Sequence, residues 1–209
     1  MTKLRNIVVI GGGLMGAGIA QVFAAANFPV IVFEPNETVR DSLRQRVADN
    51  LELMGSNPEI AARIELSDDL ATAVNSAHYV TEAAPEKLEL KRSIFADLER
   101  FAPPEAILAS NTSVIPITRI TEGLQSAHRM VGTHWWNPPY LVPLVEVIQG
   151  AGTSDSTIQN TMGLLKAIGK EPAHVKKDSP GFVANRLQHA LWRESIAMIA
   201  EGVCDAATL

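Results

Sequence analysis

The feature that most constrains the fold of this chain is a short apolar segment that leads directly into a cluster of glycines. Residues 7–10 (IVVI) are typical of a β-strand, and Gly11, Gly13 and Gly16 follow with the spacing G-x-G-x-x-G. A strand, such a turn and a helix in this order predict a dinucleotide-binding βαβ unit. Gly11 allows the tight turn, Gly13 has no Cβ to block a pyrophosphate, and Gly16 lets the helix pack close to the sheet.

The predicted helix begins at Leu14 and Met15, where unpaired backbone amides and the positive end of the helix dipole favour phosphate groups. We therefore assign both residues, with the three glycines, to the cofactor site. Glu34 ends the second predicted strand (VIVFE), eighteen positions after Gly16. Its carboxylate can accept hydrogen bonds from ribose hydroxyls and would repel the additional phosphate of NADP, which favours NAD. The alternatives are a glycine-rich turn without a ligand and a solvated glutamate at a strand end.

Strand-like and helix-like segments alternate along the rest of the chain. This alternation predicts an α/β fold with a Rossmann-type, doubly wound and mainly parallel sheet. Asn36 is expected to cap the second helix, Ser67 the helix after the third strand, and Ser154 or Asp155 the helix that ends at Gly169. The expected strands are residues 4–10, 30–34, 64–66, 78–81, 106–109, 131–134, 144–148 and 172–175.

A second domain is predicted from residue 182 onward. Residues 182–201 read as one long helix, Gly202 ends it, and residues 205–209 resemble the first turn of another helix. We expect residues 1–181 to form the NAD-binding domain and residues 182–209 to be the first helix of a truncated helical C-terminal domain. An apolar helix face requires cover, so our hypothesis is that this helix packs on a copy of itself or stays mobile.

The composition excludes several classes of function. A net charge of -5 argues against a nucleic-acid-binding surface. Cys204 is the single cysteine, which excludes an internal disulfide and fits a reducing compartment. No apolar run approaches the ~20 residues of a membrane span, and the first apolar run is too short for a signal peptide. We expect a cytoplasmic protein with a small-molecule substrate, no membrane or nucleic-acid partner and no metal site.

His134 and Glu146 are the candidates for the catalytic pair. His134 ends the strand VGTH at the sheet edge where ligands bind, and it leads into the aromatic loop WWNPP. Glu146 is the only ionisable group in the apolar strand LVEVI, so its carboxylate requires a hydrogen-bonding or cationic partner. If the two strands are neighbours, Glu146 would fix the tautomer of His134 and raise its basicity. The alternatives are a structural histidine and an edge-strand glutamate that faces water.

Together these segments resemble the L-3-hydroxyacyl-CoA dehydrogenase family. The resemblance spans nearly the whole chain, and the later motifs are far more specific than the glycines. The matching segments are GGGLMGAGIA at 11–20, Glu34, TEAAPEKLELK at 81–91, ASNTS at 109–113, HWWNP at 134–138, LVEVI at 144–148 and KDSPGFVANR at 177–186.

The resemblance implies a role for each matched residue. His134 would be the catalytic base and Glu146 its partner, while Ser113 and Asn185 would hold the substrate oxygen. The expected reaction is oxidation of a 3-hydroxyacyl-CoA to the 3-ketoacyl-CoA by hydride transfer to NAD, in fatty acid metabolism. A homodimer is expected for the full-length protein, whereas this 209-residue chain is expected to lack full activity. The residues expected around the nicotinamide end of NAD are Glu86, Lys91, Ser113 and Asn137.

Two departures from the family pattern leave the substrate open. Trp135 and Trp136 stand where acyl-CoA enzymes are expected to carry two phenylalanines. The segment after Glu34 carries arginines but no lysine, whereas the family region that contacts CoA is lysine-rich. The nearest alternative is therefore the same chemistry on a CoA-free hydroxy acid or alcohol. An alternative of a different class is a non-catalytic NAD-binding or structural protein.

Overall fold

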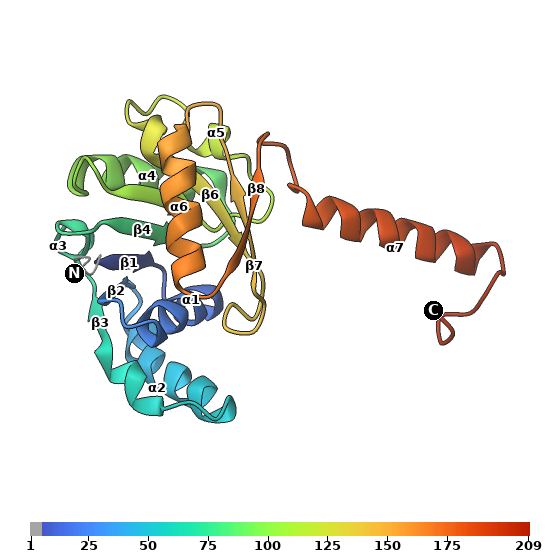
Figure 1. Ribbon diagram of the computed structural model, residues 1–209, viewed down its shortest axis with the longest axis horizontal. Helices are drawn as coiled ribbons and strands as arrows, with labels where there is room; N and C mark the ends of the chain where they lie inside the picture. The colour runs from blue at the N-terminus through green and yellow to red at the C-terminus, as the bar shows by residue number, and fades with distance from the viewer. Residues whose placement is uncertain (1–5) are drawn as a thin grey trace.

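A single eight-stranded sheet forms the centre of the molecule in the computed structural model, which describes residues 6–209 (Figure 1). Residues 4 and 5 of the first expected strand lie outside the described residues. The strands are β1 (Ile7–Ile10), β2 (Val30–Phe33), β3 (Ile64–Ser67), β4 (Tyr79–Glu82), β5 (Ile107–Ser110), β6 (Met130–Trp135), β7 (Leu144–Ile148) and β8 (Glu171–Val175).

The strand order is β3-β2-β1-β4-β5-β6-β7-β8. All neighbouring pairs from β3 to β6 are parallel, β7 runs antiparallel to β6, and β8 is parallel to β7. Because the chain starts in β1 and winds outward in both directions, the predicted doubly wound, mainly parallel sheet is confirmed. The carboxyl ends of the six parallel strands β1 to β6 therefore share one edge.

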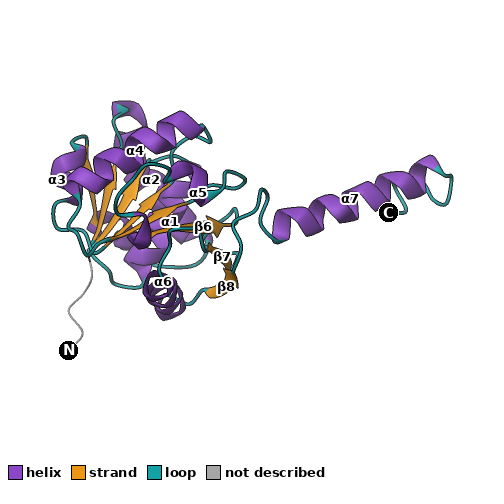
Figure 2. Ribbon diagram, turned by 90° about the horizontal axis from the view of Figure 1, so that it is seen from above, coloured by secondary structure: helices purple, strands orange, loops and turns teal. Residues whose placement is uncertain are grey.

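Helices cover both faces of the sheet (Figure 2). The α-helices are α1 (Leu14–Ala25), α2 (Glu37–Leu53), α3 (Leu70–Val74), α4 (Leu88–Phe101), α5 (Ile117–Ile120), α6 (Asp155–Ala167) and α7 (Ala184–Ala200), and the 3-10 helices are η1 (Pro58–Arg63) and η2 (Ala127–Arg129).

Alternate residues of β1 enter two different hydrophobic cores. Ile7 and Val9 pack with buried residues of α1, α2 and α6, whereas Val8 and Ile10 pack with those of α3, α4 and α5. All four are almost completely buried, since a parallel sheet covered on both faces leaves no strand face to solvent. This explains why β1 reads as a continuous apolar run.

Most of the expected helix caps are present. The side chain of Asn36 accepts a hydrogen bond from Val39 N at the start of α2, and Ser154 accepts one from Thr157 N at the start of α6. The expected cap at Ser67 is wrong: Asp69 caps α3 by accepting from Thr72 N, because Ser67 is the last residue of β3.

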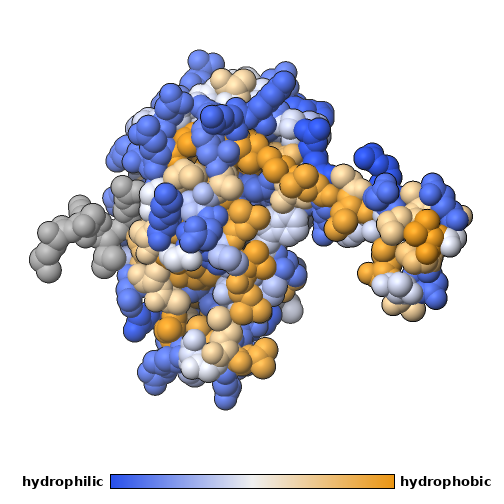
Figure 3. All heavy atoms as spheres, turned by 45° about the vertical axis from the view of Figure 1, so that its right-hand side comes forward, coloured by the Kyte–Doolittle hydropathy of each residue, from blue (hydrophilic) through white to orange (hydrophobic). Residues whose placement is uncertain are grey.

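Helix α7 projects away from the rest of the molecule, and none of its residues is buried (Figure 1). Leu187 and Leu191 are 66% and 67% exposed, and apolar side chains are visible along this arm in Figure 3. The expected helical turn at residues 205–209 is a hydrogen-bonded turn, in which Asp205 Oδ1 accepts from Thr208 N at 2.8 Å. The division at residues 181 and 182 stays a prediction.

Candidate active site

His134 and Glu146 lie side by side because β6 and β7 pair in a register that places one opposite the other. His134 Nδ1 is 2.8 Å from Glu146 Oε2, and both side chains are buried. The expectation that the two strands are neighbours is therefore confirmed. His134 is the fifth of six residues in β6, so the pair lies near the edge formed by the carboxyl ends of the parallel strands.

The second carboxylate oxygen of Glu146 accepts hydrogen bonds from the residues that lead into α7. Val183 N and Ala184 N donate to Oε1 at 2.9 and 3.0 Å. Burial raises the pKa of Glu146, but the hydrogen bonds from His134 and from these two amides outweigh it, so the net pKa lies below its ordinary value. An ionised carboxylate can only accept, so in the neutral imidazole of His134 the proton belongs on Nδ1 and the lone pair on Nε2.

Two aromatic rings enclose the His134 imidazole. The ring centroids of Trp136 and Phe182 lie 5.1 and 5.7 Å from that of His134. Phe182 is buried and has a φ of 50°, a left-handed conformation that is uncommon for a bulky residue. The imidazole of His134 thus has aromatic rings as two of its neighbours and the Glu146 carboxylate as a charged one.

Ser113 and Asn185 are in contact although they are 72 residues apart. Asn185 Nδ2 donates to the backbone carbonyl of Ser113 at 3.0 Å, and its second hydrogen is left for another acceptor. Both residues lie near the His134–Glu146 pair, because Asn185 follows Ala184 directly and Ser113 is bound to Asn185. Their roles toward a substrate oxygen stay predictions.

Glu86, in the segment after β4, organises the loop after β5. Its carboxylate accepts hydrogen bonds from Ser113 N at 3.1 Å, Val114 N at 3.3 Å and Thr112 Oγ1. Partial burial raises the pKa of Glu86, but the hydrogen bond from Thr112, the charge of Lys91 and the two amides outweigh it and lower the net pKa. Glu86 is thus held as an anion at the edge where the nicotinamide end is expected.

Lys91 is completely buried behind Glu86. Its Nζ lies 2.6 Å from Glu82 Oε1, 3.4 Å from Glu86 Oε2 and 3.2 Å from Ala84 O. Glu82 is also fully buried and accepts a hydrogen bond from Ser110 Oγ at 2.6 Å. The lysine therefore supports Glu86 from inside the protein. Sequence reasoning missed Glu82, although it had the same signal as Glu146, an acid in a buried strand.

The glycine loop borders a cavity of about 550 Å³ at the carboxyl ends of β1, β2 and β4. The cavity is open and mostly apolar, and Glu34 lies in its wall. Glu34 Oε2 accepts from Gly12 N at 2.7 Å, and Oε1 accepts from Asn36 N at 2.9 Å. The predicted cofactor residues that border this cavity are Gly11, Gly13, Leu14, Met15 and Glu34.

Each glycine of the motif has a different steric environment. A Cβ on Gly16 would lie 1.8 Å from Gly11 O, and one on Gly11, whose φ is 98°, would lie 2.9 Å from Ala83 O. A Cβ on Gly13 would meet no atom within 4 Å. Gly11 and Gly16 are therefore required by the fold, whereas the space beside Gly13 is open to a ligand. This arrangement fits a dinucleotide whose pyrophosphate lies against Gly13.

Asn137 is exposed in the loop between β6 and β7, next to the aromatic residues. Just before it, the backbone amide of Trp135 donates to Asn111 Oδ1 at 3.0 Å, which ties β6 to the loop after β5. Sequence reasoning did not single out Asn111 within the ASNTS motif.

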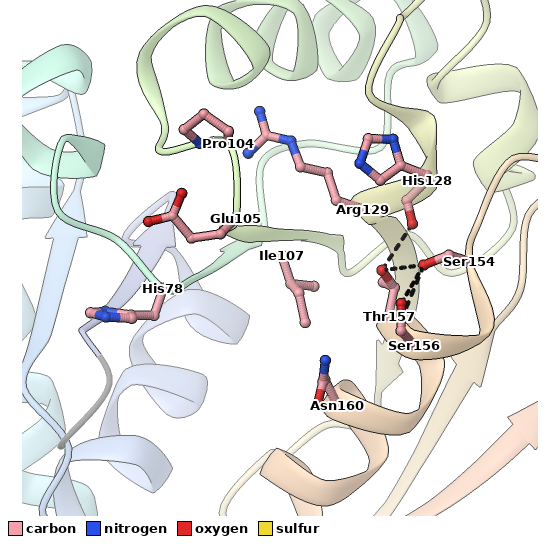
Figure 4. A pocket seen from close by; sticks show the side chains of 10 residues that line it. All are labelled: His78, Pro104, Glu105, Ile107, His128, Arg129, Ser154, Ser156, Thr157 and Asn160. Carbon is pink, nitrogen blue, oxygen red and sulfur yellow. Dashed lines mark hydrogen bonds between the residues drawn. The ribbon is translucent and has the colours of Figure 1, made fainter. Parts of the chain in front are cut away.

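A further cavity, of about 310 Å³, lies at the opposite edge of the sheet, before β4, β5 and β6 (Figure 4). Its wall includes His78, His128 and the capping group of α6, where Ser154 and Thr157 are hydrogen-bonded. None of the predicted site residues borders it.

Among residues 6–209 no cluster of three or more potential metal-binding side chains occurs. No helix in this range has the length and apolar character that crossing a bilayer requires.

The site is of the type found in nicotinamide-dependent dehydrogenases, because it combines a doubly wound sheet, an open glycine loop and a buried His–Glu pair. Residues 6–179 match the family model for the NAD-binding domain of 3-hydroxyacyl-CoA dehydrogenase. The chain therefore belongs to the 3-hydroxyacyl-CoA dehydrogenase family, and its cofactor is NAD.

Relatives in this family act on different substrates. The chain is 36% identical to 5-formyl-3-hydroxy-2-methylpyridine 4-carboxylate 5-dehydrogenase of Mesorhizobium japonicum, over 97% of this chain and 67% of that protein. It is 36% identical to L-carnitine dehydrogenase of Streptomyces coelicolor, over 96% and 64% of the two chains. The crystal structure of (S)-3-hydroxybutyryl-CoA dehydrogenase from Ralstonia eutropha has a TM-score of 0.91 and 32% identity, over 99% and 75%. The chain spans about two thirds of the length of the curated relatives that it matches.

Proposed function

We propose that the protein oxidises a secondary hydroxyl group to a ketone with NAD, and that His134 is the base. The observation that carries this proposal is the 2.8 Å contact between His134 Nδ1 and Glu146 Oε2. This contact fixes a tautomer whose Nε2 can accept a proton, near the sheet edge that the glycine loop also borders.

Each residue of the proposed site has a separate role in the reaction. His134 Nε2 takes the hydroxyl proton while the carbinol carbon loses a hydride, and the ionised Glu146 stabilises the imidazolium that forms. NAD, when bound, supplies the hydride acceptor. Ser113 and Asn185 would donate hydrogen bonds to the substrate oxygen. The aromatic rings of Trp136 and Phe182 exclude water from one side of the imidazole, which strengthens its interaction with Glu146.

For the cofactor, Gly11, Gly13, Leu14, Met15 and Gly16 would hold the pyrophosphate, and Glu34 the adenosine ribose. Glu34 accepts hydrogen bonds from Gly12 N and Asn36 N, so its carboxylate is already oriented at the cavity. At the nicotinamide end we place Glu86, Ser113 and Asn137, with Lys91 acting through Glu86.

The leading candidate for the substrate is a 3-hydroxyacyl-CoA, and membership of the family supports this choice. The second candidate is a CoA-free hydroxy acid or alcohol. It is favoured by the pair Trp135–Trp136 and by the relatives that are named for carnitine and for a pyridine carboxylate. The full-length protein, assayed by NADH formation with matched hydroxyacyl-CoA thioesters and free hydroxy acids, distinguishes the two. Turnover of the free acids alone would overturn the thioester assignment.

A non-catalytic NAD-binding protein is the third candidate. It predicts NAD binding without turnover of any hydroxy compound on such a panel. The intact His134–Glu146 pair argues against it, since a protein that only binds NAD does not require a base with a fixed tautomer. We also propose that the full-length protein is a cytoplasmic homodimer.

A further inference from the structure

Lys170 is a buried cation whose surroundings the chemistry described above does not explain. Its side chain is only slightly exposed, and among residues 6–209 it forms no salt bridge with any carboxylate. Burial lowers its pKa, because no neighbouring charge compensates the lost hydration. A buried ammonium group without a counter-ion is costly, so its presence at this place calls for a specific role.

The partners of Lys170 all belong to the chain segment that follows His134. Its Nζ donates to Val142 O at 2.9 Å and to Pro139 O, and it lies 5.5 Å from the ring centroid of Trp135. Hydrogen bonds from a charged donor are stronger than neutral ones, and the face of an indole ring attracts a cation. Lys170 therefore binds the middle and the carboxyl-terminal part of the loop formed by residues 136–143, and contacts the residue that precedes this loop.

The backbone of Lys170 is itself firmly placed. Gly169, with a φ of 80°, follows α6, Lys170 N donates to Leu165 O at 3.0 Å, and Glu171 begins β8. Because β8 pairs with β7, the backbone of Lys170 is fixed by the sheet, and its side chain extends into the loop.

The same loop also contacts helices α1 and α2. A Cβ on Gly18 of α1 would lie 2.9 Å from Pro139, so the loop packs directly on this helix. Tyr140 donates a hydrogen bond to Asn50 of α2 at 3.3 Å. The loop thus lies between the helix that begins at the glycine motif and the strand that carries His134.

We propose that Lys170 is a positioning residue for the reaction, because it fixes the loop of residues 136–143 between α1 and His134. This inference rests on the proposed function of the His134–Glu146 site. Two residues of this loop connect it to that site. Trp136 packs against the His134 ring, and Asn137 is expected at the nicotinamide. Lys170 does not border the cavity at the glycine loop, so its effect on the reaction would pass through the loop of residues 136–143.

The test is Lys170→Met in the full-length protein, with Lys166→Met as the control. Methionine keeps the length and most of the volume of the side chain but removes the charge and the donors. Lys166 lies in the last turn of α6 and is exposed. We expect kcat to fall about 10- to 100-fold in Lys170→Met, since small displacements of catalytic groups have effects of this size. NAD affinity, which depends mainly on the glycine loop, should be retained, and the control should behave like the wild type.

Hydrogen exchange provides a readout that does not depend on activity. Leu141 N and Val142 N donate to Pro138 O at 3.0 Å inside the loop. In Lys170→Met these amides should exchange faster while those of β1 and β4 stay unchanged. Lys170→Arg, which keeps the charge and the donors, should restore protection and kcat at least in part.

Unchanged exchange in the loop overturns the proposal, whether or not any substrate has been found. Faster exchange with an unchanged kcat also overturns it, since the loop would then be mobile without consequence. If Lys170→Met does not fold, Lys170→Gln is measured in its place and is judged by the same two criteria. Loss of turnover in His134→Gln together with unchanged loop exchange in Lys170→Met would show that the proposed function stands although the proposal for Lys170 fails.

Discussion

Glu146 shows how one side chain can serve two parts of the site. One oxygen accepts from His134, and the other accepts from two backbone amides at the start of α7. Its sequence signal is direct, because an acid in the apolar strand LVEVI requires partners. The histidine partner is predictable from the sequence, but the two amides are not, since nothing in the sequence indicates where the chain after β8 returns.

Replacing Glu146 with glutamine (Glu146→Gln) tests the tautomer argument at the residue scale. The side-chain oxygen of the glutamine would stay with the amides of Val183 and Ala184, and its NH₂ group would donate to His134 Nδ1. That bond forces the proton onto Nε2, so the imidazole can no longer act as a base. We expect kcat to fall by about 10⁴-fold, as such tautomer errors do in other enzymes. Steady-state kinetics measure this, and a loss below about tenfold would show that the tautomer does not matter.

The glycine motif gives a second prediction for single residues. Gly16→Ala places a Cβ 1.8 Å from a backbone oxygen, so we expect a large loss of thermal stability. Gly13→Ala meets no atom, so we expect an unchanged melting temperature and weaker NAD binding. Calorimetry of unfolding and of NAD binding separates the two effects. Equal NAD affinity in Gly13→Ala and the wild type would place the pyrophosphate elsewhere.

The contacts of Lys170 could not be predicted from the sequence. Its acceptors are backbone carbonyl oxygens of a loop 28 and 31 residues away. Every residue carries such a carbonyl, so the sequence does not indicate which of them accept a hydrogen bond from a lysine. The ion pair between Glu82 and Lys91 could in principle be predicted from the sequence, because an acid in a buried strand requires a partner and the next helix carries a lysine. The side-chain chemistry of strands is thus easier to predict than that of loops.

At the scale of elements, the strands are predicted well because glycines, prolines and caps separate long apolar runs. Expected ends of β2 to β8 differ from the observed ones by at most one residue, whereas β1 begins at Ile7, so residue 6 of the first expected strand lies outside it. The sequence does not predict α5 and η2, because four- and three-residue helices are too short to show a helical period. The expected cap at Ser67 is wrong because serine is common both at caps and at strand ends, and here the strand continues to it.

The junction between β8 and α7 is expected to depend on pH. The pKa of Glu146 lies below 4.5 in the folded state, so its contribution to folding is complete above 4.5 and is lost as pH falls through the lowered value. Protonation removes the charge that attracts the amides of Val183 and Ala184. Their hydrogen exchange, corrected for intrinsic rates, should therefore lose protection on acidification before that of the β1 amides. Simultaneous loss in both places would show that Glu146 does not govern the junction.

For the whole molecule, the projecting helix α7 is the part that the sequence describes least. Its apolar residues have helical spacing, which predicts the helix correctly, but an exposed face does not say what covers it. We expect the 209-residue chain to pair through this face. Sedimentation should then give a mass above that of one chain, and Leu187→Glu should reduce it. A clean monomer with an ordered, solvated α7 would contradict the pairing.

The arrangement of the whole fold explains why the site forms where it does. Six parallel strands, β1 to β6, end at one edge. Of these, β1 and β2 bring the glycine loop and Glu34, and β4 to β6 bring Glu86, Ser113 and His134. The antiparallel β7 adds Glu146 from the opposite direction in the chain. These residues lie far apart in the sequence, and the sheet order alone brings them to one side of the molecule.

The most direct test of the proposed catalytic base is His134→Gln in the full-length protein, measured by NADH formation and by NAD binding. Glutamine removes the base but keeps a polar side chain beside Glu146. We predict a loss in kcat of about 10²- to 10⁴-fold with NAD affinity retained. Turnover at the wild-type rate in this variant would contradict the assignment of His134 as the base.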